Sequence, residues 1–284
     1  MTVAKASIGL NSVGNIAVDR HDAVYIADID RGEIVKLSSR GDVLSRWGGS
    51  GEGSGTFDGV SGLAVDGSGG VYASDEPAGC LHKLSAAGVS VAHWGGNGSA
   101  AGQFRRPQGL VLDMQGNILV ADTYNSRIQT LSPAGYPLRS WGDSRGSQPG
   151  QFDHPADVAV DHQGIVVVAD TRNARIQRLS PTGQVLGIVQ SGANGDAMEC
   201  PVGVAIDGEG NLFVADNTAI PRIIRLSPWG AWLDVWRLPA EDAGGYVQGL
   251  AVGAGDLYVT AYSSRNTPAV LKLSTRGEVI EIWR

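Results

Sequence analysis

Residues 107–141 read PQGLVLDMQGNILVADTYNSRIQTLSPAGYPLRSW, and this stretch decides the fold. It contains four short runs of residues that favour strands, at 109–113, 118–122, 127–132 and 136–141. Turn-forming Gly, Asn and Pro residues separate these runs, and no helical periodicity connects them. The pattern predicts four short antiparallel strands that follow one another as a β-meander.

The same unit recurs along the whole chain. The dipeptide Leu-Ser recurs once per unit, from Leu37-Ser38 to Leu273-Ser274, at intervals of 47 residues with one interval of 48. In five copies a tryptophan stands ten residues after the leucine: Trp47, Trp94, Trp141, Trp236 and Trp283. In the fourth copy Val189 takes its place. Repeats of this length with four short strands each are typical of propellers. We therefore predict an all-β, six-bladed β-propeller with four antiparallel strands per blade, in which the tryptophans pack between blades.

The repeats fill the chain, so we expect a single propeller over residues 1–284. The blades are expected at about 13–49, 60–96, 107–143, 155–191, 201–238 and 247–284. The last predicted outer strand, at 279–282, belongs to its own blade, so we expect no exchange of a strand between the termini. Either packing of the inner strands closes the ring, or the chain is a domain of a longer protein. We expect a monomer.

Composition narrows the function classes. Of 284 residues 41 are Gly, 18% are charged, and the net charge is −7. No apolar run reaches the length of about 18 residues that a membrane span needs. Two cysteines do not make a disulfide framework, which favours a reducing compartment. We therefore expect no membrane association, and either a cytoplasmic protein or a soluble domain of a larger one.

The repeats resemble NHL repeats, and the resemblance covers the whole chain. The segments that carry the resemblance are 107–113 with 118–128, 155–161 with 168–176, and the Gly-Gln-Phe linkers at 102–104 and 150–152. The resemblance implies a propeller. It selects no function, because NHL propellers include RNA-binding and protein-binding modules, kinase sensor domains and a zinc-dependent lyase. That lyase places histidines directly after the position of the proline that begins each inner strand, and this chain has none there. The likeness to the lyase therefore stops at the fold.

One rim of the ring carries the long loops between blades and the Asp-x-x-Asn-x-Arg segments, and we call this rim the loop face. Long loops on a rigid scaffold are where binding sites usually lie. Directly before the proline position the six blades supply Ser12, Gly59, Arg106, His154, Cys200 and Tyr246. Directly after it they supply Gly14, Ser61, Gln108, Ala156, Val202 and Gln248. The next position is Gly in four blades but Asn15 and Asp157 in the other two. A residue that departs from its repeat is a candidate for function.

Two kinds of chemistry remain open at these positions. If the protein is an enzyme, a hydrolase or lyase, then His154 and Cys200 make a base and a nucleophile, and Tyr246 serves as an acid. Asn15 and Asp157 offer oxygen ligands to a Ca²⁺ ion, the one cofactor considered, although a hard cation wants about six oxygens. A general nucleic-acid binder is not expected from an acidic chain with few aromatics beside its arginines, so RNA binding is disfavoured.

The interpretation that we favour is a binding propeller. The loop face around the channel is predicted to recognise a peptide, another protein or a small anionic molecule, because arginines gather on blades three and four. The residues predicted to bind it are Arg106, Gln108, Asp157, Arg172 and Gln248. Asp residues that end the second strands are expected to pair locally with arginines such as Arg127 and Arg175.

Overall fold

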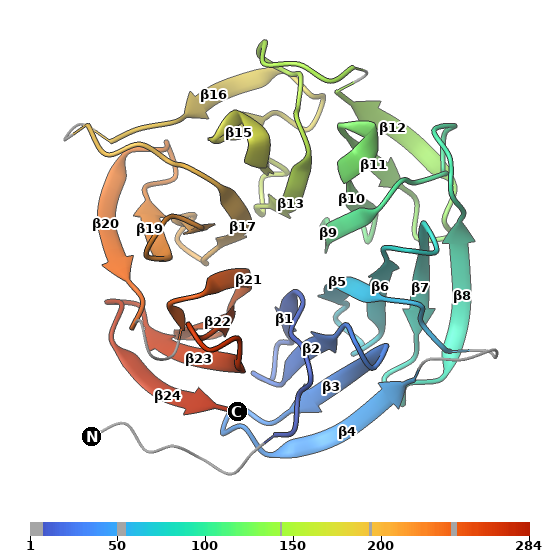
Figure 1. The fold of residues 1–284 in the computed structure, drawn as a ribbon. Helices are drawn as coiled ribbons and strands as arrows, with labels where there is room; N and C mark the ends of the chain where they lie inside the picture. The colour runs from blue at the N-terminus through green and yellow to red at the C-terminus, as the bar shows by residue number, and fades with distance from the viewer. Residues whose placement is uncertain (1–7, 50–54, 143, 193–194, 240–242) are drawn as a thin grey trace.

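The computed structural model is a ring of six antiparallel four-stranded sheets, with the first strand of each sheet at the centre and the fourth at the perimeter (Figure 1). It describes residues 8–49, 55–142, 144–192, 195–239 and 243–284. The predicted all-β, six-bladed propeller with four antiparallel strands per blade is confirmed. In the described part of the chain, no helix is long and apolar enough to cross a membrane.

The first three blades follow the chain from its N-terminal side. Their strands are β1 (Ile16–Val18), β2 (Val24–Asp28), β3 (Glu33–Leu37), β4 (Val43–Gly48), β5 (Val60–Val65), β6 (Val71–Asp75), β7 (Cys80–Leu84), β8 (Ser90–Gly95), β9 (Pro107–Leu112), β10 (Ile118–Asp122), β11 (Arg127–Leu131) and β12 (Pro137–Trp141). A short 3₁₀ helix, η1 (Thr123–Asn125), joins β10 to β11.

The other three blades repeat the arrangement. Their strands are β13 (Pro155–Val160), β14 (Val166–Asp170), β15 (Arg175–Leu179), β16 (Val185–Val189), β17 (Pro201–Ile206), β18 (Leu212–Asp216), β19 (Arg222–Leu226), β20 (Trp232–Arg237), β21 (Tyr246–Val252), β22 (Asp256–Tyr262), β23 (Pro268–Ser274) and β24 (Val279–Trp283). A second 3₁₀ helix, η2 (Thr171–Asn173), joins β14 to β15.

Burial follows the position of a strand in its blade. All five residues of β2, β6, β10, β14 and β18 are buried, because the second strand has a strand on either side and a neighbouring blade against each face. Their sequences are accordingly apolar on both faces, as in the VVVAD of β14. Outer strands such as β8 alternate between half-buried and exposed residues, as expected for a sheet with one face in solvent. The apolar core therefore lies between the blades.

The repeated tryptophans hold neighbouring blades together, as their repetition predicts. A Cβ atom added at Gly88 would lie 2.1 Å from Trp47, which comes from the preceding blade. Gly88 also has a φ of +78°, so the turn and the contact both call for glycine. In blade four Val189 takes the place of the tryptophan and contacts Gly230 of the next blade in the same way.

The ring closes through side chains that pass from blade six to blade one. Trp283, at the end of β24, packs on Gly41 of blade one, where an added Cβ would lie 2.7 Å from the indole. The hydroxyl of Tyr262 accepts a hydrogen bond of 2.8 Å from the backbone N–H of Val13. Each terminal sheet is built from its own consecutive strands, β1–β4 and β21–β24, within the described residues. Packing rather than strand exchange closes the ring there, and residues 1–7 lie outside the described part.

A buried aspartate ends the second strand in blades one to five, and in blades three to five an arginine of the third strand pairs with it. The carboxylate of Asp122 accepts hydrogen bonds from the Nε of Arg127 at 2.7 Å and from the Nε2 of Gln129 at 3.1 Å. Asp170 has the same two partners from Arg175 and Gln177, at 2.7 Å and 3.0 Å. These pairs confirm the predicted local role of the aspartates, which is to tie the loop-face turn to the third strand.

Candidate functional site

A cavity of about 310 Å³ opens on the loop face at the axis of the ring, and we call it the axial cup. All six residues that directly follow the proline position line it: Gly14, Ser61, Gln108, Ala156, Val202 and Gln248. They reach the axis because each lies near the start of an inner strand, and these strands surround the channel (Figure 1). The repeat spacing therefore locates the wall of the cup correctly.

The predicted site residues divide between the cup and its surroundings. His154, Arg172, Gln108, Gln248 and Asn15 line the cup. The lining set includes His154 but none of its counterparts Arg106, Cys200 and Tyr246, so the residues before the proline position are not brought together in it.

Arg106 stands at the edge of the cup. Its Nε lies 3.4 Å from a carboxylate oxygen of Glu76, and its guanidinium lies over the ring of Tyr124, 5.3 Å from the centroid. Both of these partners line the cup. The φ of Arg106 is +51°, a left-handed conformation that is uncommon outside glycine and that the sequence does not predict. Arg106 is therefore within reach of a ligand that extends beyond the rim.

His154 is held in a fixed orientation at the wall. Its Nδ1 lies 2.6 Å from the Oδ1 of Asp153, and its ring meets that of Tyr124 edge to face at 4.9 Å. Burial acts to raise the pKa of Asp153, but hydrogen bonds from His154 and Arg145 outweigh it and lower that pKa. An imidazole bonded through Nδ1 to a carboxylate leaves Nε2 available for other hydrogen bonds.

Cys200 and Tyr246 are not among the residues that line the cup. The backbone N–H of Cys200 donates to Asp216 at 2.8 Å, and no hydrogen bond joins its thiol to His154 among the described residues. Burial, followed by the negative charges of Asp216 and Glu199, raises the pKa of the Cys200 thiol, which disfavours the thiolate. Tyr246 stacks on Tyr262 with 4.6 Å between the ring centroids. The catalytic roles considered for this pair stay predictions.

Asn15 and Asp157 meet at the floor of the cup. The Oδ1 of Asp157 accepts the N–H of Val158 and the Oδ2 accepts the N–H of Val204, each at 2.9 Å. A further hydrogen bond comes from the side chain of Asn15, which lies on the opposite side of the ring. Below this bridge the channel continues as a second cavity of about 230 Å³ between the six inner strands. The two residues therefore divide the channel, and a calcium ion at this pair stays a prediction.

The carboxyl of Asp157 is expected to make the stability of the protein depend on pH. Burial raises its pKa from 3.8 to about 7, against the hydrogen bonds from Val204, Val158 and Asn15. The folded protein therefore holds this proton more tightly than the unfolded chain, and stability is expected to fall as pH rises from about 4 to about 7. Thermal unfolding of wild-type protein and of an Asp157→Asn variant, between about pH 5 and about pH 8, measures this. The variant should show a smaller slope, and parallel curves would contradict the expectation.

Sequence reasoning missed the residues that follow the aspartate of each second strand. Ile29, Glu76, Thr123 and Thr171 occupy this position and line the cup. Burial raises the pKa of Glu76 although the nearby Arg106 acts against it. The signal was present in the sequence, because these residues stand at one fixed position of the repeat, where Ile29 and Glu76 depart from the threonine of blades three and four.

Half of the eight arginines between residues 105 and 178 pair with carboxylates. The pairs are Arg106 with Glu76 at 3.4 Å, Arg127 with Asp122 at 2.7 Å, Arg145 with Asp153 at 3.0 Å and Arg175 with Asp170 at 2.7 Å. Arg172 is exposed, lines the cup, and has no carboxylate partner among the described residues. Its backbone N–H donates to the backbone carbonyl of Asp153 at 3.1 Å, which fixes the segment that carries it.

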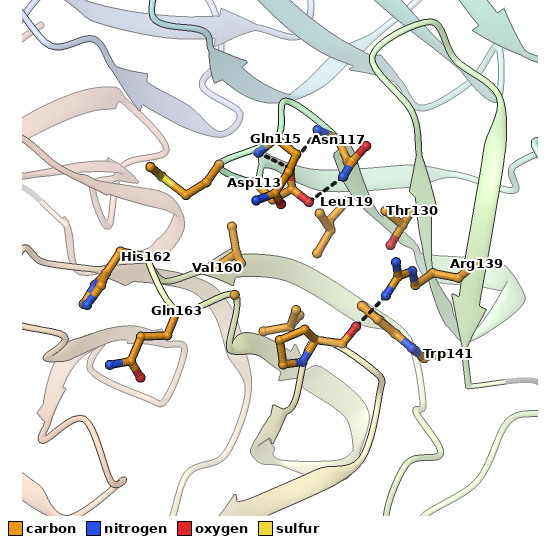
Figure 2. Close-up of a pocket in the computed structure, with 14 residues that line it drawn as sticks. Asp113, Gln115, Asn117, Leu119, Thr130, Arg139, Trp141, Val160, His162 and Gln163 are labelled. Atoms are coloured by element: carbon orange, nitrogen blue, oxygen red, sulfur yellow. Dashed lines mark hydrogen bonds between the residues drawn. The ribbon is translucent and has the colours of Figure 1, made fainter.

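Another cavity, of about 250 Å³, lies between blades three and four on the opposite rim (Figure 2). Its polar groups are largely engaged in the local turns. Asp113 accepts hydrogen bonds from Asn117 and Gln115, and Arg139 donates to the carbonyl of Pro181 at 2.6 Å. The axial cup, at whose wall Arg172 has no carboxylate partner in the described part of the chain, is the better candidate for a functional site.

The fold and the cup define a six-bladed propeller with an axial site on its loop face. The family model of the NHL repeat matches residues 104–131 and 152–179, in blades three and four. These two matches and the six-bladed ring around them support the resemblance to NHL-repeat propellers that the sequence predicts.

Solved structures with the same fold include lyases and WD40 repeats. A streptogramin B lyase is 17% identical with a TM-score of 0.69, over 98% of this chain and 85% of that one. Virginiamycin B lyase from Staphylococcus aureus is 16% identical with a TM-score of 0.67, over 96% and 84%. The WD40 repeats of RRP9 are 13% identical with a TM-score of 0.69, over 100% and 84%. At these identities the likeness shows the fold alone. Comparison with curated protein sequences finds no match.

Proposed function

We propose that the axial cup binds a molecule or peptide through an anionic group, a carboxylate or a phosphate. The observation that carries the proposal is Arg172, an exposed guanidinium at the wall of the cup without a carboxylate partner in the described part of the chain. Guanidinium groups bind carboxylates and phosphates with two parallel hydrogen bonds. A ligand with such a group would be anchored at blade four and extend over the cup.

The rest of the wall supports a small polar ligand. Gln108 and Gln248 line the cup, and no hydrogen bond from either side-chain amide to another described residue is present. Amides supply both donors and acceptors. The bridge between Asn15 and Asp157 closes the floor, so a ligand of the cup would lie above it.

The test is a binding measurement with a matched pair of variants. Inorganic phosphate, citrate and short peptides with free C-termini are titrated into the protein, with heat of binding and thermal shift as readouts. Arg172→Gln should weaken binding of any ligand that is found by roughly tenfold or more, since a hydrogen bond to a charged group contributes about 1.5–3 kcal/mol. Arg276→Gln removes an exposed arginine from a turn of the opposite rim and should change nothing. Equal loss in both variants would contradict the proposal.

A hydrolase or lyase is the second candidate, and the carboxylate bonded to His154 favours it. A histidine oriented by Asp153 at 2.6 Å and lining the cup has the arrangement of a general base. The same titration distinguishes the two functions when the mixtures are examined for product. Conversion that is lost in His154→Asn, with binding retained, would identify an enzyme. Binding without conversion would support the binding function.

A further inference from the structure

Blade two departs from its neighbours around the buried aspartate that ends its second strand. Asp75 pairs across the sheet with Cys80, as Asp122 of blade three pairs with Arg127. Two residues further along, His82 stands where blade three has Gln129. The arginine and the amide that serve the aspartate in blades three and four are therefore replaced together by a thiol and an imidazole.

The three side chains converge on one point. The Sγ of Cys80 lies 3.3 Å from the Nε2 of His82, and the same Nε2 lies 3.6 Å from the Oδ2 of Asp75. All three ligand atoms lie within 4.8 Å of one another. Bond lengths of about 2.3 Å to sulfur and about 2.0–2.2 Å to nitrogen and oxygen set the edges of a zinc tetrahedron at about 3.3–3.6 Å. The distances of 3.3 Å and 3.6 Å have that size.

We propose that Asp75, Cys80 and His82 bind one Zn²⁺ ion. A thiolate, an imidazole and a carboxylate are the three ligand types that zinc takes in proteins, and water completes the tetrahedron. On binding, the Cys80 thiol releases its proton to solvent and the sulfur forms the bond to the metal. The ion takes the electrostatic role that Arg127 has in blade three, since it places positive charge beside the buried aspartate.

The surroundings hold the ligands in place and leave an entry. Asp75 also accepts the backbone N–H of Asp58 through Oδ2 at 2.8 Å and that of Ala78 through Oδ1 at 3.3 Å, which fixes the carboxylate. The ring of Phe57 meets His82 edge on at 4.9 Å. The His82 side chain keeps 13% of its surface exposed, so an ion can reach it from solvent. None of the three ligands lines the axial cup.

Metal titration of the whole protein tests the proposal. After treatment with a chelator, the protein should take up one zinc ion per chain by elemental analysis, and its thermal unfolding should shift upward. Co²⁺ used in place of zinc should give a thiolate-to-cobalt charge-transfer band in the near ultraviolet. Cys200→Ser, which removes the other thiol, should leave both results unchanged.

The chain supplies its own matched variant. The double substitution Cys80→Arg with His82→Gln copies Arg127 and Gln129 of blade three, so it should fold without a metal and lose the cobalt band and the shift with zinc. If it does not fold, Cys80→Ser serves, and it should lose the cobalt band while it stays folded. The proposal is overturned if the wild type takes up no zinc, or if the band survives in a folded Cys80 variant.

Discussion

Trp283→Ala is expected to lower the free energy of unfolding by about 3–5 kcal/mol, the usual cost when a large buried aromatic is cut to alanine. Trp283 is fully buried and belongs to the core cluster of blade one, with Val24, Ile26 and Leu37. It comes from the last strand of the chain, so its removal empties a volume at the point where blade six meets blade one. The remaining contacts of this closure include Tyr258, Tyr262 and Val270 in the same cluster, together with the hydrogen bond from Val13 to Tyr262.

Trp229→Ala is the matched control for this result. Trp229 is 81% exposed on a turn, so its removal should change stability by less than about 0.5 kcal/mol. Urea unfolding followed by circular dichroism measures both variants without reliance on tryptophan fluorescence. A loss below about 1 kcal/mol for Trp283→Ala would mean that the ring holds without this contact, against the large cost expected of a filled core.

The fold was predictable from the sequence because it repeats. Each blade contributes another copy of the same evidence, so the strand order, the tryptophan contacts and the residues after the proline position all follow from spacing. A departure such as Val189 is also visible by this comparison, and the structure shows it packed as its counterparts are. Repetition thus gives a single sequence an internal standard for its fold.

The details of the site were less predictable from the sequence, because they depend on the direction that each side chain takes in the fold. His154 and Cys200 occupy equal positions in the repeat, yet only His154 lines the cup. The backbone conformation alone does not decide this, because Arg106 holds the equal position in blade three with a φ of +51°, close to the +52° of His154, and does not line the cup. Tyr124 lies in the 3₁₀ helix η1, directly after the second strand of blade three, and from there it lines the cup.

The cluster of Asp75, Cys80 and His82 in blade two was not predicted from the sequence for a different reason. Cys80 and His82 are two residues apart, and on a strand such residues point to the same face. Their significance depends on Asp75, which the cross-strand register places opposite Cys80. The comparison with Arg127 and Gln129 of blade three was available in the sequence, because all four residues lie at fixed distances from their Leu-Ser dipeptides.

Gly62→Ala is expected to cost at least about 3 kcal/mol or to prevent folding, because overpacking forces the backbone to move. An added Cβ at Gly62 would lie 2.1 Å from the backbone oxygen of Gln108, in the inner strand of the next blade. A flexible side chain gives way to such a contact, whereas a carbonyl held in a strand does not. The same displacement would move Gln108 in the wall of the cup.

Gly203→Ala tests whether this cost comes from the contact rather than from the loss of a glycine. Gly203 holds the equivalent position in blade five, but there the nearest atom to an added Cβ is the methyl Cδ2 of Leu250, at 3.3 Å. A leucine methyl moves by a few tenths of an ångström at little cost, so this variant should lose less than about 1.5 kcal/mol. Chemical unfolding measures both. Equal losses of unfolding free energy in the two variants would mean that the inner ring tolerates no Cβ at this position. The expected difference would show that the close approach of blades two and three requires Gly62.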